Sequence, residues 1–301
     1  MKKAVVTGGA GFIGSHIADG LLTEGYEVHI IDNLSGGKRE NVPEGATFHE
    51  LDVLDTVAVT EICKGADAVF HEAALPQVQF SIEQPMESHR VNVDGTLSAL
   101  VAARDAGVKR FVYAASAAAY GNQPELPFRE DMPASPVHPY GVHKYTGELN
   151  VKLFADVYGL STVSLRYFNV YGPRMDPSSP YGIVIALFLK QHREGKSLKI
   201  TGDGSQTRDF VHVKDVVRAN IAAATHAGVG KGEVINIGTG KGITISALAD
   251  MIASGEREML PARVEIKDAV ADISKAKALL GWEPSISLHD GIEALKQEYG
   301  V

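Results

Sequence analysis

Residues 7–14 read TGGAGFIG, and they join two segments of different periodicity. The run KKAVVTG (residues 2–8) before them has the apolar character of a buried strand, whereas GFIGSHIADGLLTEG (residues 11–25) carries apolar residues at helical spacing. Among the four glycines of this stretch, Gly8, Gly11 and Gly14 form the spaced triplet. This order is typical of a dinucleotide site, because glycines permit the tight turn, the approach of a diphosphate and close helix packing. A glycine-rich turn without a ligand would show the same spacing.

Strand-like and helical segments alternate along the chain from this turn to residue 169. Helical segments such as NVDGTLSALVAARDAG (residues 92–107) separate most of the strand-like runs. Strands that alternate with helices predict a parallel sheet with helices on both faces, and right-handed crossovers make it a doubly wound (Rossmann) α/β sheet. After the first strand, the strand-like runs are YEVHIIDN (26–33), TFHELDV (47–53), ADAVFHEAA (66–74), KRFVYAAS (109–116) and STVSLRYFN (161–169).

The texture of the chain changes after Asn169. Residues 171–182 form a loop segment rich in proline, glycine and serine, and residues 196–213 read as a hairpin or as two short strands. A helical segment (213–228) and a strand-like run (232–238) then return to the earlier pattern. We therefore expect a dinucleotide-binding domain and a smaller, discontinuous C-terminal domain. The predicted domains are residues 1–168, with a return at about 209–237, and mainly residues 169–301.

Composition excludes several classes of function. The chain has 301 residues and a formal net charge of -8, with no cluster of lysine and arginine of the kind that nucleic acids require. The single cysteine, Cys63, cannot form an intrachain disulfide, and the 11 histidines show no metal-ligand spacing. The apolar run GIVIALFL (182–189) is far shorter than the roughly 20 residues of a membrane span. The N-terminal apolar run is too short for a signal peptide. We expect a soluble, cytoplasmic protein without metal, membrane or nucleic-acid partners.

Two acidic positions point to the nucleotide. Asp32 ends the second predicted strand, where a carboxylate can accept hydrogen bonds from both adenosine ribose hydroxyls and would repel a 2′-phosphate. Asn33, not arginine, follows it, which favours NAD over NADP, although Lys38 and Arg39 come soon after. Asp52 ends the third strand and reads equally well as an adenine contact or as a turn-forming residue.

Tyr140 and Lys144 lie one helical turn apart, at the start of a predicted helix in PYGVHKYTGE (139–148). Tyrosine has a pKa of about 10 and is a poor base at neutral pH. A lysine charge about 5 Å away, at an effective dielectric constant of about 20, would lower that pKa by about 2 units. The positive nicotinamide of NAD would lower it further, toward the range of an efficient general base. Alternatively, the pair is only two amphipathic side chains on a solvated face.

Eight collinear segments resemble the extended short-chain dehydrogenase/reductase family, and most closely its nucleotide-sugar 4-epimerases. The likeness runs from residue 1 to about residue 290. Eight segments in the same order are far more specific than the glycine turn or the Tyr–Lys pair alone. The segments are TGGAGFIGSH (7–16), HEAALPQVQFSIEQP (71–85), NVDGTL (92–97), FVYAASAAAYG (111–121), PYGVHKYTGE (139–148), LRYFNVYGPR (165–174), GDGSQTRDFVHVKDV (202–216) and ADISKAKALLGWEP (271–284).

The resemblance implies a role for each residue that matches the family motifs. Tyr140 becomes the catalytic base and acid, Lys144 its partner, and Ser116 the hydroxyl that holds the sugar O4. The implied NAD contacts, beside Tyr140 and Lys144, are Gly8, Gly11, Phe12, Ile13, Gly14, Asp32, Asn33, Asp52, Val53, Ala73, Ala74, Asn92 and Tyr167. The implied substrate contacts, beside Ser116 and Tyr140, are Asn169, Arg208 and Arg263, with Lys267 as the alternative to Arg263.

Purely structural roles for some of these candidate residues stay open. Ser116 would also suit a strand end, Arg208 could pair with Asp209 in a hairpin, and His143 either faces solvent or perturbs the Tyr–Lys couple. The resemblance also implies a homodimer, formed by the helix that begins near Asn92 and the Tyr/Lys helix. Apolar residues at four-residue spacing on the latter fit one buried stripe. They are Leu149, Leu153 and Val157.

The expected reaction is epimerisation at C4 of a UDP-sugar, UDP-glucose/UDP-galactose or the N-acetylated pair, through a transient 4-keto sugar. Dehydratases and decarboxylases of the family carry acidic residues just after the serine, where this chain has Ala117 and Ala118. These two alanines favour an epimerase. The alternative function is another NAD-dependent enzyme of nucleotide sugars, a dehydratase, decarboxylase or reductase, and the less favoured one is a dinucleotide-binding sensor without turnover. Ala269 stands where a large tyrosine would narrow the sugar pocket, which suggests room for an N-acetyl group.

Overall fold

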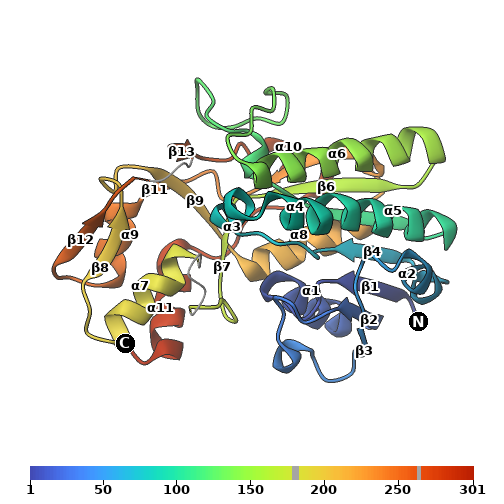
Figure 1. Cartoon of the computed structure of the whole chain (residues 1–301), viewed down its shortest axis with the longest axis horizontal. Helices are drawn as coiled ribbons and strands as arrows, with labels where there is room; N and C mark the ends of the chain where they lie inside the picture. Colours follow the sequence, from blue (N-terminus) through green and yellow to red (C-terminus); the bar gives the residue numbers. More distant parts are fainter. Residues whose placement is uncertain (178–182, 263–265) are drawn as a thin grey trace.

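The computed structural model describes residues 1–177, 183–262 and 266–301, and its larger lobe is built on a seven-stranded parallel sheet. The strand order is β10-β6-β5-β4-β1-β2-β3 (Figure 1). Strands β2 and β3 are added on one side of β1, and the chain then crosses over to add β4, β5 and β6 on the other side, as in doubly wound folds. The predicted α/β class is confirmed, and every strand-like run of the first half joins this sheet. The strands are β1 (Lys3–Thr7), β2 (Glu27–Asp32), β3 (Thr47–Glu50), β4 (Ala68–His71), β5 (Arg110–Ser116), β6 (Thr162–Tyr167) and β10 (Lys231–Ile237).

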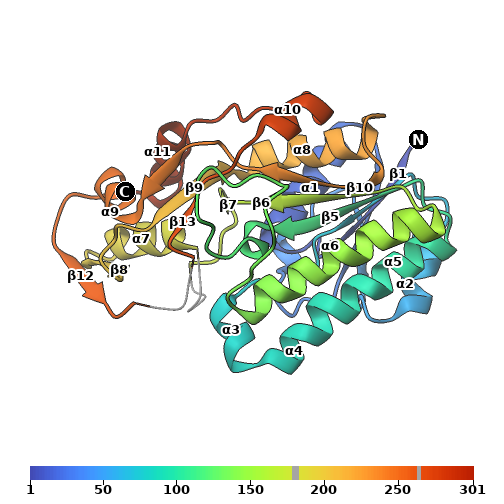
Figure 2. The same ribbon diagram turned by 90° about the horizontal axis from the view of Figure 1, so that it is seen from above.

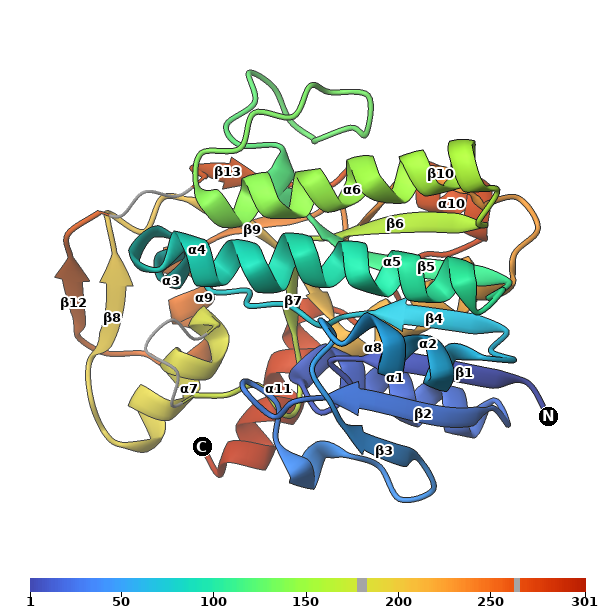
Figure 3. The same cartoon turned by 45° about the vertical axis from the view of Figure 1, so that its right-hand side comes forward.

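Helices cover both faces of this sheet, because its central strands β1, β4, β5 and β6 are buried on both sides. One face packs against α1 (Phe12–Thr23), α8 (Val213–Thr225) and α10 (Ser274–Leu280). The other packs against α2 (Thr56–Cys63), α5 (Gly95–Asp105) and α6 (Pro139–Tyr158), with Cys63 buried among them (Figure 2). The α5 and α6 helices lie side by side in front of the sheet in Figure 3. The remaining short helices of the large lobe are η1 (Arg39–Asn41), α3 (Val78–Glu83), α4 (Pro85–His89), η2 (Arg90–Asp94, one π-helical turn) and η3 (Ala117–Ala119).

The smaller lobe, on the left of Figure 1, has its own apolar core and two small sheets. Strand β9 pairs with β7, β11 and β13, while β8 pairs only with β12 among the described strands. The hairpin considered for residues 196–213 is therefore wrong, and the alternative of two separate strands is right. Leu198 and Ile200 of β8 are buried in the small core, which they share with Phe210 of β9. The elements are β7 (Asn169–Tyr171), α7 (Val184–Arg193), β8 (Leu198–Thr201), β9 (Thr207–His212), β11 (Gly242–Thr244), α9 (Ile245–Ile252), β12 (Arg257–Leu260), β13 (Asp268–Ala269) and α11 (Leu288–Tyr299).

One carboxylate ties the C-terminal segment back to the large lobe. Asp215, buried at the start of α8, accepts hydrogen bonds from the backbone N–H groups of Ser285 and Ile286 at 3.0 and 3.1 Å. The indole N–H of Trp282 donates to the Asp215 carbonyl at 2.9 Å, and the ring is buried. None of the helices among the described residues is long and apolar enough to cross a bilayer.

A buried ion pair fixes α6 to the sheet. Arg166 on β6 donates two hydrogen bonds to the Glu148 carboxylate, at 2.8 and 2.6 Å, and the two side chains are 4% and 2% exposed. The guanidinium also lies 4.4 Å from the centre of the Tyr120 ring. Because removal of one partner would strand a charge away from water, this pair constrains where α6 can sit.

Replacement of Arg166 by Met should lower the free energy of unfolding by about 3–5 kcal/mol, since the Glu148 carboxyl is left buried without its cation. Urea denaturation followed by circular dichroism measures the loss. The double variant Glu148→Leu/Arg166→Met removes both charges and should lose much less. A loss below about 1 kcal/mol for the single variant would contradict this role for the ion pair.

Candidate active site

Tyr140 and Lys144 lie in the first turns of α6. Pro139 and the His138 cap, whose Nδ1 accepts the Gly141 N–H at 3.1 Å, begin the helix at this point. Lys144 is 4% exposed, and its Nζ donates to the Ala114 carbonyl of β5 at 2.7 Å. Tyr140 is partly buried, and its N–H donates to Ser81 Oγ at 3.1 Å. The solvated-face interpretation of this pair is therefore wrong.

Ser116 is brought to the same place by the end of β5. Its hydroxyl lies close enough to the Tyr140 side chain to lower the pKa of that phenol, and it accepts the Ala118 N–H at 3.2 Å, which starts the short turn η3. Because β5 carries both Ser116 and the Ala114 carbonyl that holds Lys144, one strand end positions all three candidate catalytic groups. A hydroxyl and a phenol that meet at one point can bind a single substrate oxygen and transfer its proton.

The protonation of Tyr140 differs from the sequence-based expectation. Burial raises the pKa of Tyr140 to about 12, the hydrogen bond with Ser116 lowers it, and the charge of Glu72 raises it. The predicted lowering by Lys144 is absent from this balance. The Lys144 ammonium points at the Ala114 carbonyl, and its charge acts on Glu72 and Glu148 instead. The residues of the chain itself thus keep Tyr140 a neutral phenol.

The glycine turn has room for a diphosphate at one glycine only. A Cβ on Gly8 would lie 2.6 Å from the backbone nitrogen of Ala73, and one on Gly14 would lie 2.3 Å from the Gly8 oxygen. Both glycines serve close packing of the chain. A Cβ on Gly11 would meet only the Gly8 oxygen, at 3.1 Å, and would otherwise enter open space. Helix α1 begins at Phe12, and no side chain caps its first N–H groups, which include those of Phe12 and Ile13. This cradle fits the diphosphate of a dinucleotide.

Asp32 ends β2 beside this turn. Its Oδ2 accepts the Ala10 N–H at 3.0 Å and its Oδ1 accepts the Leu34 N–H at 2.8 Å. Burial raises its pKa, and these two backbone donors lower it. Each carboxylate oxygen keeps a lone pair for a further donor, so the residue fits the ribose hydroxyls of NAD.

Asn33 and Asp52 meet at the neighbouring strand ends. Asn33 Nδ2 donates to Asp52 Oδ2 at 3.3 Å, while Asp52 Oδ1 accepts the Leu54 N–H at 3.0 Å and so also shapes a turn. The Val53 carbonyl accepts the Ser98 hydroxyl at 2.7 Å. These contacts hold the rim of the predicted adenine site in one conformation.

Asn92 clamps the loop that carries Ala73 and Ala74. Its Oδ1 accepts the Leu75 N–H at 2.7 Å and its Nδ2 donates to the Leu75 carbonyl at 2.9 Å. The same Nδ2 lies 3.2 Å from Ser88 Oγ, which in turn lies 3.2 Å from Nδ1 of His143. His143 is therefore buried against this clamp, on the side of α6 that faces α4, and does not face solvent.

The small-lobe candidates lie on neighbouring strands. Asn169 pairs with Phe210, and Arg208 pairs with Ala269 in the strand register. Arg208 Nη1 donates to the carbonyls of Thr207 and Lys267 at 2.9 and 3.0 Å.

The Asp209 carboxylate accepts hydrogen bonds from the backbone N–H groups of Thr239, Gly240 and Ala271. Its partners are therefore these two distant segments and not a neighbouring strand of a hairpin. Arg263 lies outside the described residues.

Two side chains that contact the predicted residue Tyr167 were not themselves predicted from the sequence, namely Glu72 and Asn220. Glu72 follows β4, and its Oε1 accepts the Tyr167 hydroxyl at 2.9 Å. The Tyr167 hydroxyl also accepts Nδ2 of Asn220 at 2.7 Å. The only signal for Glu72 was a single acid within the otherwise apolar run AVFHEAAL (68–75).

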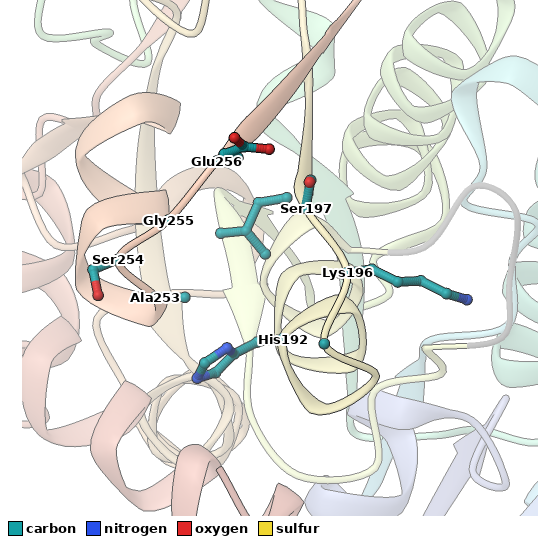
Figure 4. A pocket seen from close by; sticks show the side chains of 9 residues that line it. His192, Lys196, Ser197, Ala253, Ser254, Gly255 and Glu256 are labelled. Atoms are coloured by element: carbon teal, nitrogen blue, oxygen red, sulfur yellow. The ribbon is translucent and has the colours of Figure 1, made fainter.

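A separate pocket of about 310 Å³ lies between α7–β8 and α9–β12, at the outer end of the small lobe (Figure 4). His192, Lys196 and Glu256 are among its lining residues, and none of the predicted site residues is. Within the described ranges, no three His, Cys, Asp or Glu side chains are grouped as metal ligands.

Known proteins resemble this chain over nearly its whole length. The model of the NAD dependent epimerase/dehydratase family matches residues 4–238. UDP-glucose 4-epimerase of Mycolicibacterium smegmatis is 37% identical to this chain in an alignment 303 residues long. The alignment covers 96% of this chain and 96% of the relative. The crystal structure of UDP-glucose 4-epimerase from Thermotoga maritima with UDP-glucose is similar with a TM-score of 0.94 and 39% identity, over 99% of this chain and 98% of that one.

A second solved structure extends the range of sugars. UDP-N-acetylglucosamine 4-epimerase from Methanobrevibacter ruminantium, in complex with UDP-N-acetylmuramic acid, has a TM-score of 0.92 and 38% identity, over 99% of both chains. The glycine turn, Ser116, Tyr140 and Lys144 all lie within the residues that the family model matches. This chain therefore belongs to the NAD dependent epimerase/dehydratase family, and NAD is its cofactor.

Proposed function

We propose that this NAD-dependent UDP-sugar 4-epimerase interconverts UDP-glucose and UDP-galactose through a transient 4-keto sugar. The observation that carries the proposal is the placement of Tyr140 next to Ser116 and one helical turn from the buried Lys144. This arrangement can hold one sugar hydroxyl and move its proton. The names of the relatives from M. smegmatis and T. maritima support UDP-glucose as a substrate.

Each residue has a defined part in the proposed reaction. Ser116 holds the oxygen on C4, and Tyr140 accepts its proton and later returns it. The glycine turn and Asp32 would hold NAD, which would supply a reversible hydride acceptor for C4 of the sugar. Asn169 and Arg208, with Arg263 or Lys267, hold the diphosphate so that the keto sugar stays attached while it turns. The hydride that leaves is the hydride that returns, so the reaction has no net oxidation.

The turn after Ser116 favours epimerisation over the alternatives in this family. Elimination or decarboxylation needs an acidic side chain near the sugar, and η3 consists of Ala117, Ala118 and Ala119. A reductase would need a cofactor that exchanges in stoichiometric amounts. A sensor without turnover would not need a phenol, a hydroxyl and a buried ammonium at one strand end.

Ala269 supports a pocket that also accepts N-acetylated sugars. It is 4% exposed and lies in one cluster with Ala117, Phe128 and Phe168, next to the turn that follows Ser116. Its strand partner is Arg208, one of the proposed diphosphate ligands. A methyl side chain at this position takes up less space than a tyrosine would, and the M. ruminantium relative is named for an N-acetylated sugar.

The exposed face of α6 supports a homodimer. Leu149, Leu153 and Val157 are 54%, 50% and 62% exposed in the single chain, so the described residues leave the stripe predicted to be buried open to solvent. Leu97 of the adjacent α5 is 42% exposed. Two copies that pair these helices would bury the apolar faces in a four-helix bundle.

Tyr140→Phe should lower kcat for UDP-galactose by about 10²–10⁴-fold, because the proton acceptor is lost while the ring still packs. Bound NAD, measured after denaturing release, should stay at the level of the unmodified enzyme. Tyr145→Phe, in the next turn of α6, is the matched control and should keep full turnover. A Tyr140→Phe enzyme within tenfold of the parent would overturn the assignment.

Ala269→Tyr should reduce kcat/KM for the UDP-N-acetylglucosamine pair at least about tenfold more than for the UDP-glucose pair, because the added ring fills the space for the acetyl group. Coupled assays on both pairs give the ratio. An equal loss on both pairs would assign Ala269 to packing alone.

Leu153→Glu should convert the proposed dimer to a monomer, because it buries a charge in an apolar interface. Light scattering should give twice 32.1 kDa for the parent and 32.1 kDa for the variant. Met259→Glu, an exposed apolar residue on β12 in the small lobe, is the control and should stay dimeric. A monomeric parent would refute the dimer.

A further inference from the structure

The loop of residues 120–138, between η3 and α6, lies next to β13 of the small lobe (Figure 2). Gly121 near its start has a φ of +64°, and a Cβ there would lie 1.7 Å from the Ser135 oxygen. The Gln123 side-chain amide donates to two carbonyls of the same loop, at 2.6 and 2.9 Å. These contacts close the base of the loop, so Asn122, which lies between the two anchored residues, starts from a fixed backbone.

The Asn122 side chain holds Lys267 of the small lobe. Its Oδ1 accepts the Lys267 backbone N–H at 3.0 Å. Because a backbone N–H can only donate, the amide oxygen of Asn122 must face this partner. Both residues are exposed, so water can replace either partner, and the bond sets a position more than it stabilises the fold. The segment that it places leads directly into β13.

The carbonyl of the same residue holds Arg208. The Lys267 carbonyl accepts Nη1 of Arg208 at 3.0 Å and the Thr207 N–H at 3.1 Å. Nη1 also donates to the Thr207 carbonyl at 2.9 Å. A guanidinium is planar and carries its N–H groups in a fixed fork, so two anchors on one nitrogen set the direction of the others. Asn122 thus acts on Arg208 through one intervening residue.

We propose that Asn122 is a positioning residue for the substrate, which holds Lys267 so that the Arg208 guanidinium is aimed at the diphosphate of the bound nucleotide sugar. The proposal rests on the proposed function, in which Arg208 is a diphosphate ligand. A guanidinium that is already aimed loses less conformational freedom when the substrate binds. One loop then joins the sugar end of the site, at Ser116, to its diphosphate end.

A role in loop structure alone makes a different prediction from a role through Arg208. If Asn122 only closes the loop, its loss should weaken substrate binding whether or not Arg208 is present. If Asn122 aims Arg208, its effect on binding must vanish once that side chain is removed, because the two residues then act as one unit.

A double-mutant cycle on UDP binding by the NAD-loaded enzyme separates these roles. Asn122→Ala should weaken UDP binding about 3–10-fold, the effect of losing one ordinary hydrogen bond. Arg208→Met should weaken it more, because it removes the charge that contacts the diphosphate. Asn122→Ala added to Arg208→Met should change the affinity by less than about twofold. Isothermal titration calorimetry measures each affinity.

Turnover of UDP-galactose gives a second readout. Asn122→Ala should raise KM by the same factor as it weakens UDP binding and leave kcat within about twofold, since the diphosphate is held alike in the ground state and the transition state. Asn122→Leu has a similar shape without the acceptor and should behave in the same way. Glu125→Ala is the matched control, because Glu125 is exposed on the same loop and pairs with Arg129 at 2.9 Å; it should keep the parent affinity and KM.

Equal losses from Asn122→Ala in the two backgrounds, or unchanged UDP affinity in Asn122→Ala and Asn122→Leu, would overturn the proposal. An Arg208→Met enzyme that binds UDP as tightly as the parent would also overturn it, since Arg208 would then have no diphosphate to hold. An unmodified enzyme without epimerase activity, whose UDP binding shows the predicted coupling, would refute the proposed function and support the positioning role of Asn122.

Discussion

The hydrogen bond from Lys144 to the Ala114 carbonyl determines where the rest of the site can lie. An ammonium that is 4% exposed would be costly without a partner, and this bond of 2.7 Å supplies one while it ties α6 to β5 at one register. Tyr140, one turn earlier on α6, then lies beside Ser116, the last residue of β5. The ion pair of Glu148 and Arg166 holds the same helix against β6.

The two lobes meet at the turn that follows Ser116. Phe128 donates its N–H to the Val270 carbonyl at 2.7 Å, and its own carbonyl accepts the Asp272 N–H at 2.9 Å. These bonds hold the segment of Ala269 above the catalytic strand end, and β13 in turn holds Arg208 through its register with β9. A substrate with a diphosphate in one lobe and a sugar at the other would be gripped at both ends, which suits a reaction in which the intermediate must turn without leaving.

The sequence predicts the parts of this structure that depend on local patterns. Apolar periodicity located the strands of the large sheet, and the glycine turn lies between β1 and α1 as expected. The apolar pattern did not decide whether β8 and β9 pair with each other, because their true partners come from distant segments. It took no account of the burial that raises the pKa of Tyr140 in the chain alone, and it left the surroundings of His143 open, because burial depends on what packs around a side chain. Glu72 was missed for the same reason, since only the tertiary structure brings it to the Tyr167 hydroxyl.

The most direct test of the account follows the hydrogen on C4. UDP-galactose carrying deuterium at C4 would be turned over in ordinary water without added reductant, and the UDP-glucose formed would be examined by mass spectrometry and proton NMR. Transfer of a hydride to the bound cofactor and back predicts that deuterium stays at C4 of the product. Replacement of the deuterium by solvent hydrogen would contradict a 4-epimerase that works through a retained hydride and a bound 4-keto sugar.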